Sequence, residues 1–236
     1  MGNKNGRKRT IISVGGSLIV PSEGIGVEFL KNLNAFVRKK LAEDPTRQFF
    51  LVTGGGATAR QYINAGQEVL EQKMSRDDLD WLGIHGSRLN AHLVRTIFRD
   101  IAHPHIVKNY EIIRKAKESV VVAAGWKPGW STDYCSILIG EDYGVNTILN
   151  LSNIAQVFDK DPREFDDAKP IEKINWADFR KLVGDDWTPG MNAPFDPIAA
   201  KSAEELGIKV VVMSGMDFDN IEKYIDGKDF VGTIIE

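Results

Sequence analysis

Five short apolar runs alternate with longer amphipathic segments, and this alternation restricts the fold more than any other feature of the chain. The runs are continuous and mostly β-branched, as in parallel strands buried on both faces; they are 10–14, 49–52, 120–124, 147–151 and 209–213. The segments between them have helical periodicity, at 27–41, 58–70, 87–101, 132–143 and 196–206. This succession predicts an α/β fold with a mostly parallel central sheet covered by helices on both faces.

The charge balance and the cysteine content exclude several classes of protein. Lys plus Arg total 30 against 33 Asp plus Glu, a net charge of −3, so no general attraction to nucleic acid or an anionic membrane is expected. Any anionic ligand must be held locally. The single cysteine, Cys135, cannot form an internal disulfide, which suits a cytoplasmic protein. No apolar stretch is long enough to predict a membrane span.

Three polar segments are expected to lie outside the regular elements. Residues 1–9, MGNKNGRKR, are basic and lack the apolar region of a secretory signal, so we expect a disordered terminus and a fold that begins at residue 10. The stretch 159–169 is interpreted as a loop between two lobes, although a surface loop or hairpin tip has the same composition. The Gly/Pro-rich stretch 184–197 predicts a mobile loop.

Glycine clusters directly follow the first three predicted strands. They are Gly15-Gly16-Ser17, residues 54–56 and residues 125–129. In an open α/β sheet, ligands bind at the carboxyl ends of the strands, where glycines let backbone N–H groups approach phosphate oxygens. Each cluster alone is compatible with an ordinary strand-to-helix turn, but three at one edge predict a polyphosphate site.

The commonest signatures of catalytic sites are missing from the chain. It contains no G-x-x-x-x-G-K-[ST] loop, no G-x-G-x-x-G opening a helix, no G-x-S-x-G elbow and no H-E-x-x-H. The four histidines have no obvious carboxylate partner in the sequence; they are His85, His92, His103 and His105. We therefore assign no side chain as a metal ligand.

The ordered set of motifs resembles the amino acid kinase superfamily, and within it the uridylate kinases, most closely their archaeal-type branch. The resemblance covers about residues 10–236. Its pieces are SVGGSL (13–18), VTGGGATAR (52–60), LDWLGIHGSRLNAHLV (79–94), KPGWSTD (127–133), LSNIAQVFDKDP (151–162), FDPIAAKSAEELGIKV (195–210) and GTIIE (232–236).

The resemblance implies a three-layer α/β/α sandwich that phosphorylates UMP to UDP with ATP and Mg²⁺. About 10–150 would bind the acceptor and about 151–236 would bind ATP, in a homo-hexamer. Acceptor-binding residues would be Gly55, Gly56, Arg60, Asp80 and Thr132. ATP-binding residues would be Gly15, Gly16, Ser17, Ser152, Asn153, Phe158, Asp161 and Pro162.

The resemblance also places Gly16, Asp133 and Lys201 at the reaction centre. Backbone amides at Gly16 would meet the transferring phosphoryl group, and Asp133 would orient the groups around it. Two plainer interpretations stay open: Asp133 as the N-cap of the helix at 132–143, and Lys201 as an exposed helix lysine.

The chain departs from the family pattern where two lysines are usual. Val14 ends the first strand where many members carry a lysine just before the glycines, and Ala57 stands where the archaeal-type branch often has one after the glycines. Lys127 or Lys201 could replace the lost charge, because a flexible ammonium reaches a phosphate from several attachment points. Trp126 replaces a usual Thr or Ser and, with Trp130, would shape the pocket if the acceptor differed. The alternatives are therefore another acceptor, or a nucleotide-binding storage protein.

Overall fold

A seven-stranded sheet forms the centre of the molecule. The computed structural model describes residues 6–113, 115–184 and 193–236. The strand order across the sheet is β3 (Val120–Ala123), β2 (Arg47–Thr53), β1 (Lys8–Val14), β4 (Thr147–Ser152), β8 (Lys209–Ser214), β9 (Thr233–Ile235) and β7 (Lys173–Ile174). The five predicted strands are confirmed, and they are mutually parallel; β9 runs antiparallel to β8.

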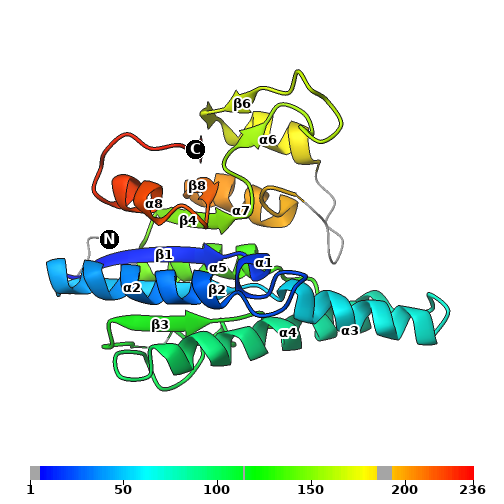
Figure 1. Ribbon diagram of the computed structural model, residues 1–236, viewed down its shortest axis with the longest axis horizontal. Coiled ribbons are helices and arrows are strands. Elements are labelled where there is room, and N and C mark those ends of the chain that lie inside the picture. Colours follow the sequence, from blue (N-terminus) through cyan, green and yellow to red (C-terminus); the bar gives the residue numbers. More distant parts are fainter. Residues whose placement is uncertain (1–5, 114, 185–192) are drawn as a thin grey trace.

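Helices cover both faces of this sheet, so the predicted three-layer α/β/α arrangement is confirmed (Figure 1). One face packs against α1 (Gly16–Ile19), α2 (Val27–Glu43), α4 (Arg76–Ile97) and α8 (Phe218–Ile225). The other packs against α5 (Thr132–Tyr143), α6 (Trp176–Val183) and α7 (Pro197–Leu206). Successive strand residues point to opposite faces: Ile12 and Val14 join the first core and Ile11 joins the second. α3 (Gly56–Val69) lies along α4 rather than on the sheet (Figure 1).

The strand register brings the carboxyl ends of the central strands level. β1 pairs with β2 up to Val14 and Thr53, and with β4 up to Val14 and Leu151. β1 therefore lies between β2 and β4 in the sheet. The turns that leave these three strands meet at one edge. That point, where the strand order reverses, is where open α/β sheets bind ligands.

The fold begins earlier than the sequence predicts. β1 starts at Lys8, so residues 8 and 9, which we expected in the disordered terminus, belong to the sheet. Side-chain hydrogen bonds explain this, because Arg9 Nη1 donates to Tyr143 O (2.9 Å) and Arg7 Nη1 donates to Glu118 O (3.2 Å). Residues 1–5 lie outside the described part of the chain.

The helix expected at 87–101 begins at Arg76 instead. Ser75 caps it, since its hydroxyl accepts from Asp78 N (3.1 Å), and two aspartates in the first turn favour the helix N-terminus. The sequence-based prediction therefore missed its first half, which carries Asp80. Among the described residues, no helix is both long and apolar enough to cross a membrane.

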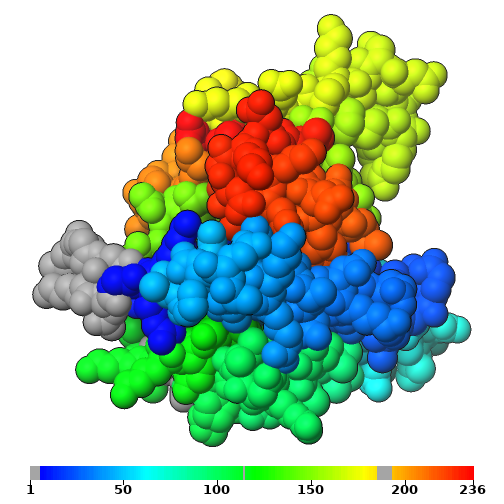
Figure 2. Space-filling view, turned by 60° about the vertical axis from the view of Figure 1, so that its left-hand side comes forward, coloured from blue at the N-terminus to red at the C-terminus, as the bar shows by residue number. Residues whose placement is uncertain are grey.

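The polar stretch 159–169 is the tip of a hairpin, so its interpretation as a connection between two lobes is wrong. It joins β5 (Val157–Phe158) to the antiparallel β6 (Pro170–Ile171), and this yellow-green segment projects from the body in Figure 2. The pairing continues into the stretch, where Asp159 N donates to Lys169 O (3.1 Å). The loop predicted at 184–197 falls mostly outside the described residues, which resume at Ala193.

Candidate functional site

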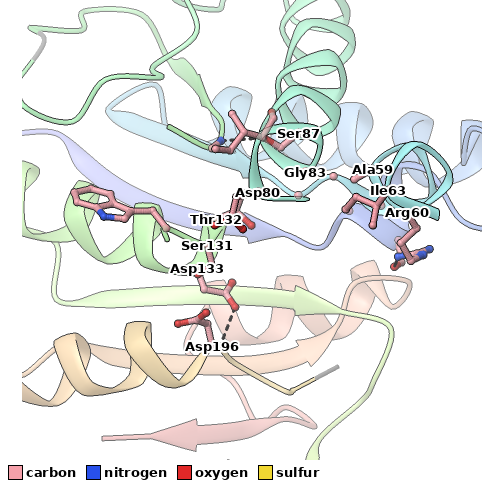
Figure 3. Close-up of a pocket in the computed structure, with 18 of the residues that line it drawn as sticks. Ala59, Arg60, Ile63, Asp80, Gly83, Ser87, Ser131, Thr132, Asp133 and Asp196 are labelled. Carbon is pink, nitrogen blue, oxygen red and sulfur yellow. Dashed lines mark hydrogen bonds between the residues drawn. The ribbon is translucent and has the colours of Figure 1, made fainter. Parts of the chain in front are cut away.

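A cavity of about 570 Å³ opens at the carboxyl edge of the sheet, between the glycine turns, α4 and the start of α5 (Figure 3). Many of the predicted site residues line it. They are Gly16, Ser17, Gly55, Gly56, Arg60, Asp80, Thr132, Asp133 and Asn153.

The glycine turns after β1 and β2 pack backbone against backbone. A Cβ atom on Gly16 would lie 2.1 Å from Gly56 N and 2.6 Å from the carbonyl carbon of Gly54, so no larger residue fits there. Gly56 also adopts φ +61°, which favours glycine. The close approach leaves the polypeptide backbone as the floor of the cavity, the surface that binds phosphate oxygens in many nucleotide sites.

One face of α4 holds the turns that follow β2 and β3. Asn90 Nδ2 donates to Gly54 O (2.8 Å) and to Gly55 O (3.0 Å), while Ser87 Oγ accepts from Gly125 N (3.0 Å). Carbonyls of the glycine turn are thus tied to the helix. Of these two residues, Ser87 lines the cavity, whereas Asn90 supports the turn from outside the cavity wall.

Arg60, on α3, carries positive charge to the cavity wall. Its guanidinium is exposed, and Nη1 donates to Ser17 Oγ (3.3 Å), which joins the turn after β1 to the helix after β2. A guanidinium in this place can bind a phosphate through two parallel hydrogen bonds.

Asp80 and Arg88 hold the tryptophan-containing loop, residues 125–131, against α4. Asp80 Oδ2 accepts from Gly129 N (2.7 Å), and Arg88 donates to Gly125 O (3.1 Å) and Trp126 O (2.8 Å). Burial raises the pKa of Asp80, and the hydrogen bond from Gly129 opposes that rise. Asp80 therefore shapes the loop as well as lining the cavity.

Aromatic rings of this loop pack edge-to-face on one another and on Tyr134. Trp130 lies edge-on to Trp126 (4.9 Å between ring centroids) and to Tyr134 (4.7 Å), and the Lys127 Nζ atom lies 4.2 Å and 4.6 Å from the two indole centroids. Of these residues, Trp130 lines the cavity, and Trp126 packs against Trp130.

Asp133 is not the helix cap that one interpretation of the sequence suggested. Ser131 caps α5 by accepting from Tyr134 N (3.0 Å), so the Asp133 carboxylate is free to face the cavity. Its Oδ1 accepts from Ser13 Oγ (3.0 Å) and its Oδ2 from Asp196 N (3.2 Å). Burial, together with the negative charge of Asp196, raises the pKa of Asp133 to about 6.

Asp196 is a site residue that the sequence analysis missed. It is 6% exposed, lines the cavity, and caps α7 through Oδ1, which accepts from Ala199 N (2.7 Å). Its Oδ2 atom is buried and has no hydrogen-bond partner among the described residues. Burial raises the pKa of Asp196, opposed by the Ala199 amide and the nearby Ser131 hydroxyl. An Asp-Pro pair opening a helix was the visible signal, and it indicates a cap as readily as a ligand.

The remaining predicted residues do not line this cavity. Gly15, Ser152, Phe158, Asp161, Pro162 and Lys201 are outside its wall. Gly15 N donates to Leu151 O (2.9 Å), and Phe158 and Asp161 belong to the projecting hairpin. Arg163 pairs with Asp161 and lowers its pKa to about 2. Lys201 is exposed on α7, so the structure does not bring its ammonium group into the cavity.

Comparisons with known proteins find relatives that cover most of the chain. The family model described as "Amino acid kinase family" matches residues 8–214. The chain is 37% identical over 190 residues to a uridylate kinase of Sulfurisphaera tokodaii, covering 79% of this chain and 82% of that protein. It is 32% identical over 231 residues to a uridylate kinase of Pyrococcus abyssi, covering 97% and 99%. The crystal structure of uridylate kinase from Archaeoglobus fulgidus superimposes with a TM-score of 0.77 at 28% identity, covering 97% of this chain and 100% of that one.

Proposed function

The chain belongs to the amino acid kinase family, and we propose that it is a uridylate kinase, which transfers the γ-phosphoryl group of ATP to UMP and releases UDP and ADP. The observation that carries the proposal is the cavity itself. Backbone turns packed against each other form its floor, in a chain that shares its fold with a uridylate kinase of known structure.

UMP would occupy the side of the cavity next to α3 and α4. Gly55 and Gly56 would offer backbone amides to its phosphate, Arg60 a guanidinium, and Thr132 a hydroxyl. Asp80 would accept a hydrogen bond from the ribose while it keeps Gly129 in place. Trp130 would form the wall beside the base.

The transfer needs no general base, because the phosphate of UMP is already an anionic nucleophile near neutral pH. The protein must instead hold the acceptor oxygen in line with the γ-phosphoryl group and stabilise charge on its equatorial oxygens. Backbone groups at Gly16 and Ser17 would supply hydrogen bonds there, and Asp133 would fix the position of the groups around the reaction centre.

ATP would extend from this centre toward the C-terminal part of the chain, about 151–236. Gly15, Ser152 and Asn153 lie at the turn after β1 and the end of β4, next to the cavity floor. Phe158, Asp161 and Pro162 would contact the nucleotide from the hairpin, and Lys201 would approach its phosphates from α7. Residues 10–150 would then form the acceptor part.

Mg²⁺ would enter with ATP, and the residues present fit such an ion. Asp133 and Asp196 offer carboxylate oxygens, which hard divalent cations prefer, at the cavity wall. Bound there, the ion would neutralise charge on the transferring phosphates. We also propose that the protein works in the cytoplasm as a homo-hexamer, as the family resemblance implies; size-exclusion chromatography with light scattering would test the assembly.

The decisive experiment is ADP formation by the purified protein with Mg-ATP and one acceptor at a time: UMP, CMP, AMP, GMP, dUMP or isopentenyl phosphate. We expect UMP to give the highest kcat/KM. Faster turnover with another acceptor would keep the phosphoryl chemistry and overturn the substrate. ATP binding without turnover of any acceptor would contradict the kinase function.

A further inference from the structure

Two carboxylates meet at the cavity wall without a cationic partner. Asp133 lies in the first turn of α5 and Asp196 precedes α7, and Figure 3 shows their carboxyl groups beside one another. Within the described ranges no ion pair joins either group to Lys, Arg or His; both accept hydrogen bonds from neutral donors alone. Within the described residues, the negative charge at this point is therefore uncompensated.

One oxygen of this pair lacks even a hydrogen bond. Three of the four carboxylate oxygens have donors, from the Ser13 hydroxyl and from the amides of Asp196 and Ala199. The fourth, Asp196 Oδ2, is buried and unpartnered in the described part of the chain, although its residue is 94% buried and lines the cavity. A buried oxygen without a donor costs free energy unless another group satisfies it, and a cation does so for a carboxylate.

The nearby residues in the described part of the chain do not supply a compensating charge either. Val14 occupies the end of the strand and its side chain lies in the core, while Ser13 meets Asp133 with a neutral hydroxyl. Lys201 is exposed outside the cavity wall, and the Lys127 ammonium rests over two indole rings. Neither lysine compensates the pair in this structure.

We propose that Asp133 and Asp196 together bind the divalent cation that accompanies the nucleotide, so that metal charge compensates the two carboxylates. Mg²⁺ is commonly held by one or two carboxylates together with substrate phosphates and water, so two protein ligands suffice. The inference rests on the proposed function in one respect, that the cavity receives the ATP phosphates.

Metal binding can be measured without catalysis. We would titrate the full chain with Mn²⁺ and follow free Mn²⁺ by electron paramagnetic resonance, with and without a non-hydrolysable ATP analogue. Tb³⁺ emission excited through tryptophan gives a second readout, because Trp130 lines the same cavity. We expect one Mn²⁺ per chain that Mg²⁺ displaces.

Asp196→Asn is the informative variant, since Asn retains the ability to cap α7 and removes the charge. We expect it to weaken Mn²⁺ binding at least about tenfold and to abolish the Tb³⁺ emission. Asp133→Asn, a substitution on α5, should also weaken Mn²⁺ binding and abolish the Tb³⁺ emission. Asp219→Asn, an exposed carboxylate on α8, is the control and should bind Mn²⁺ as the wild type does.

Unchanged Mn²⁺ affinity in Asp196→Asn, or no Mn²⁺ binding by the wild type in either condition, would overturn the proposal. Its failure is distinguishable from failure of the proposed function. If the wild type turns over UMP but Asp196→Asn binds Mn²⁺ with unchanged affinity, only the metal site is contradicted. If Mn²⁺ binding depends on Asp196 but the wild type does not turn over UMP, only the kinase assignment is contradicted.

Discussion

Asp80 Oδ2 accepts a 2.7 Å hydrogen bond from the backbone N–H of Gly129, and this contact couples α4 to the loop after β3. Asp80 is 7% exposed, and it lies about two helical turns before Ser87 and Arg88, which contact the same loop. A residue predicted to bind ribose thus also positions Trp130.

Replacing Asp80 separates these two roles. Asp80→Asn retains an oxygen that accepts from Gly129 N, whereas Asp80→Ala leaves that amide unpaired. We expect Asp80→Ala to lower the free energy of unfolding by about 1–3 kcal/mol and Asp80→Asn to lower it less. Both should raise KM for UMP more than KM for ATP. Equal KM increases for the two substrates would contradict the acceptor assignment.

Gly16→Ala should destabilise the site severely. The added Cβ would fall 2.1 Å from Gly56 N, a distance that only a displacement of the two turns can relieve. We expect a loss of at least about 2 kcal/mol in urea unfolding and a large fall in kcat. Gly83→Ala is the matched comparison, because a Cβ there meets no atom within 4 Å, and a helix interior gains about 0.5–1 kcal/mol from alanine. Equal stability of the two variants would refute the packing argument.

Arg60 should strengthen UMP binding because its guanidinium can form two parallel hydrogen bonds to the phosphate. Loss of a charged hydrogen bond to phosphate costs about 1.5–3 kcal/mol, so Arg60→Ala should raise KM for UMP about 10- to 100-fold. Arg60→Lys retains the positive charge but cannot form two parallel hydrogen bonds, so its KM for UMP should lie between those of the wild type and Arg60→Ala. Steady-state kinetics at saturating ATP provides the test; complete recovery by lysine would show that charge alone matters.

Asp133 should make the metal-free protein less stable as the pH rises. Its pKa is about 6 in the folded chain and 3.8 in the reference state, so between these values the folded chain holds a proton that the unfolded chain has released. Stability therefore falls as the pH increases toward 6 and stays lower above it.

Asp133→Asn removes this effect while Asn can still accept from Asp196 N and donate to the Ser13 hydroxyl. We would measure the free energy of unfolding in urea, with EDTA present, for the wild type and for Asp133→Asn. The variant's free energy of unfolding minus that of the wild type should be about 2 kcal/mol larger at pH 7.5 than at pH 4.5. Asp219→Asn on α8 should lack this pH dependence. A pH-independent difference between wild type and Asp133→Asn would contradict the raised pKa.

Local sequence signals predicted the elements that position the site, because each depends on residues adjacent in the chain. The apolar runs correspond to β1, β2, β3, β4 and β8, and the helix at 132–143 matches α5. The first half of α4 was missed because its start depends on the Ser75 cap rather than on an apolar stripe. A hairpin tip at 159–169 was only an alternative interpretation, and the strands β5 and β6 were not predicted, because two-residue strands carry almost no periodicity.

The sequence by itself determined the α/β class, the three glycine turns at the strand ends and the family motifs, since contiguous apolar runs and turn glycines encode local conformation directly. Only the tertiary structure decided which carboxylates share the cavity. Ser13 and Asp133 are 120 residues apart in the chain, and Asp133 and Asp196 are 63 apart, yet hydrogen bonds join them. Such contacts depend on strand order and helix placement, so no local pattern contains them. The unpartnered oxygen of Asp196 likewise exists only in the folded chain, where burial has removed the water that would satisfy it.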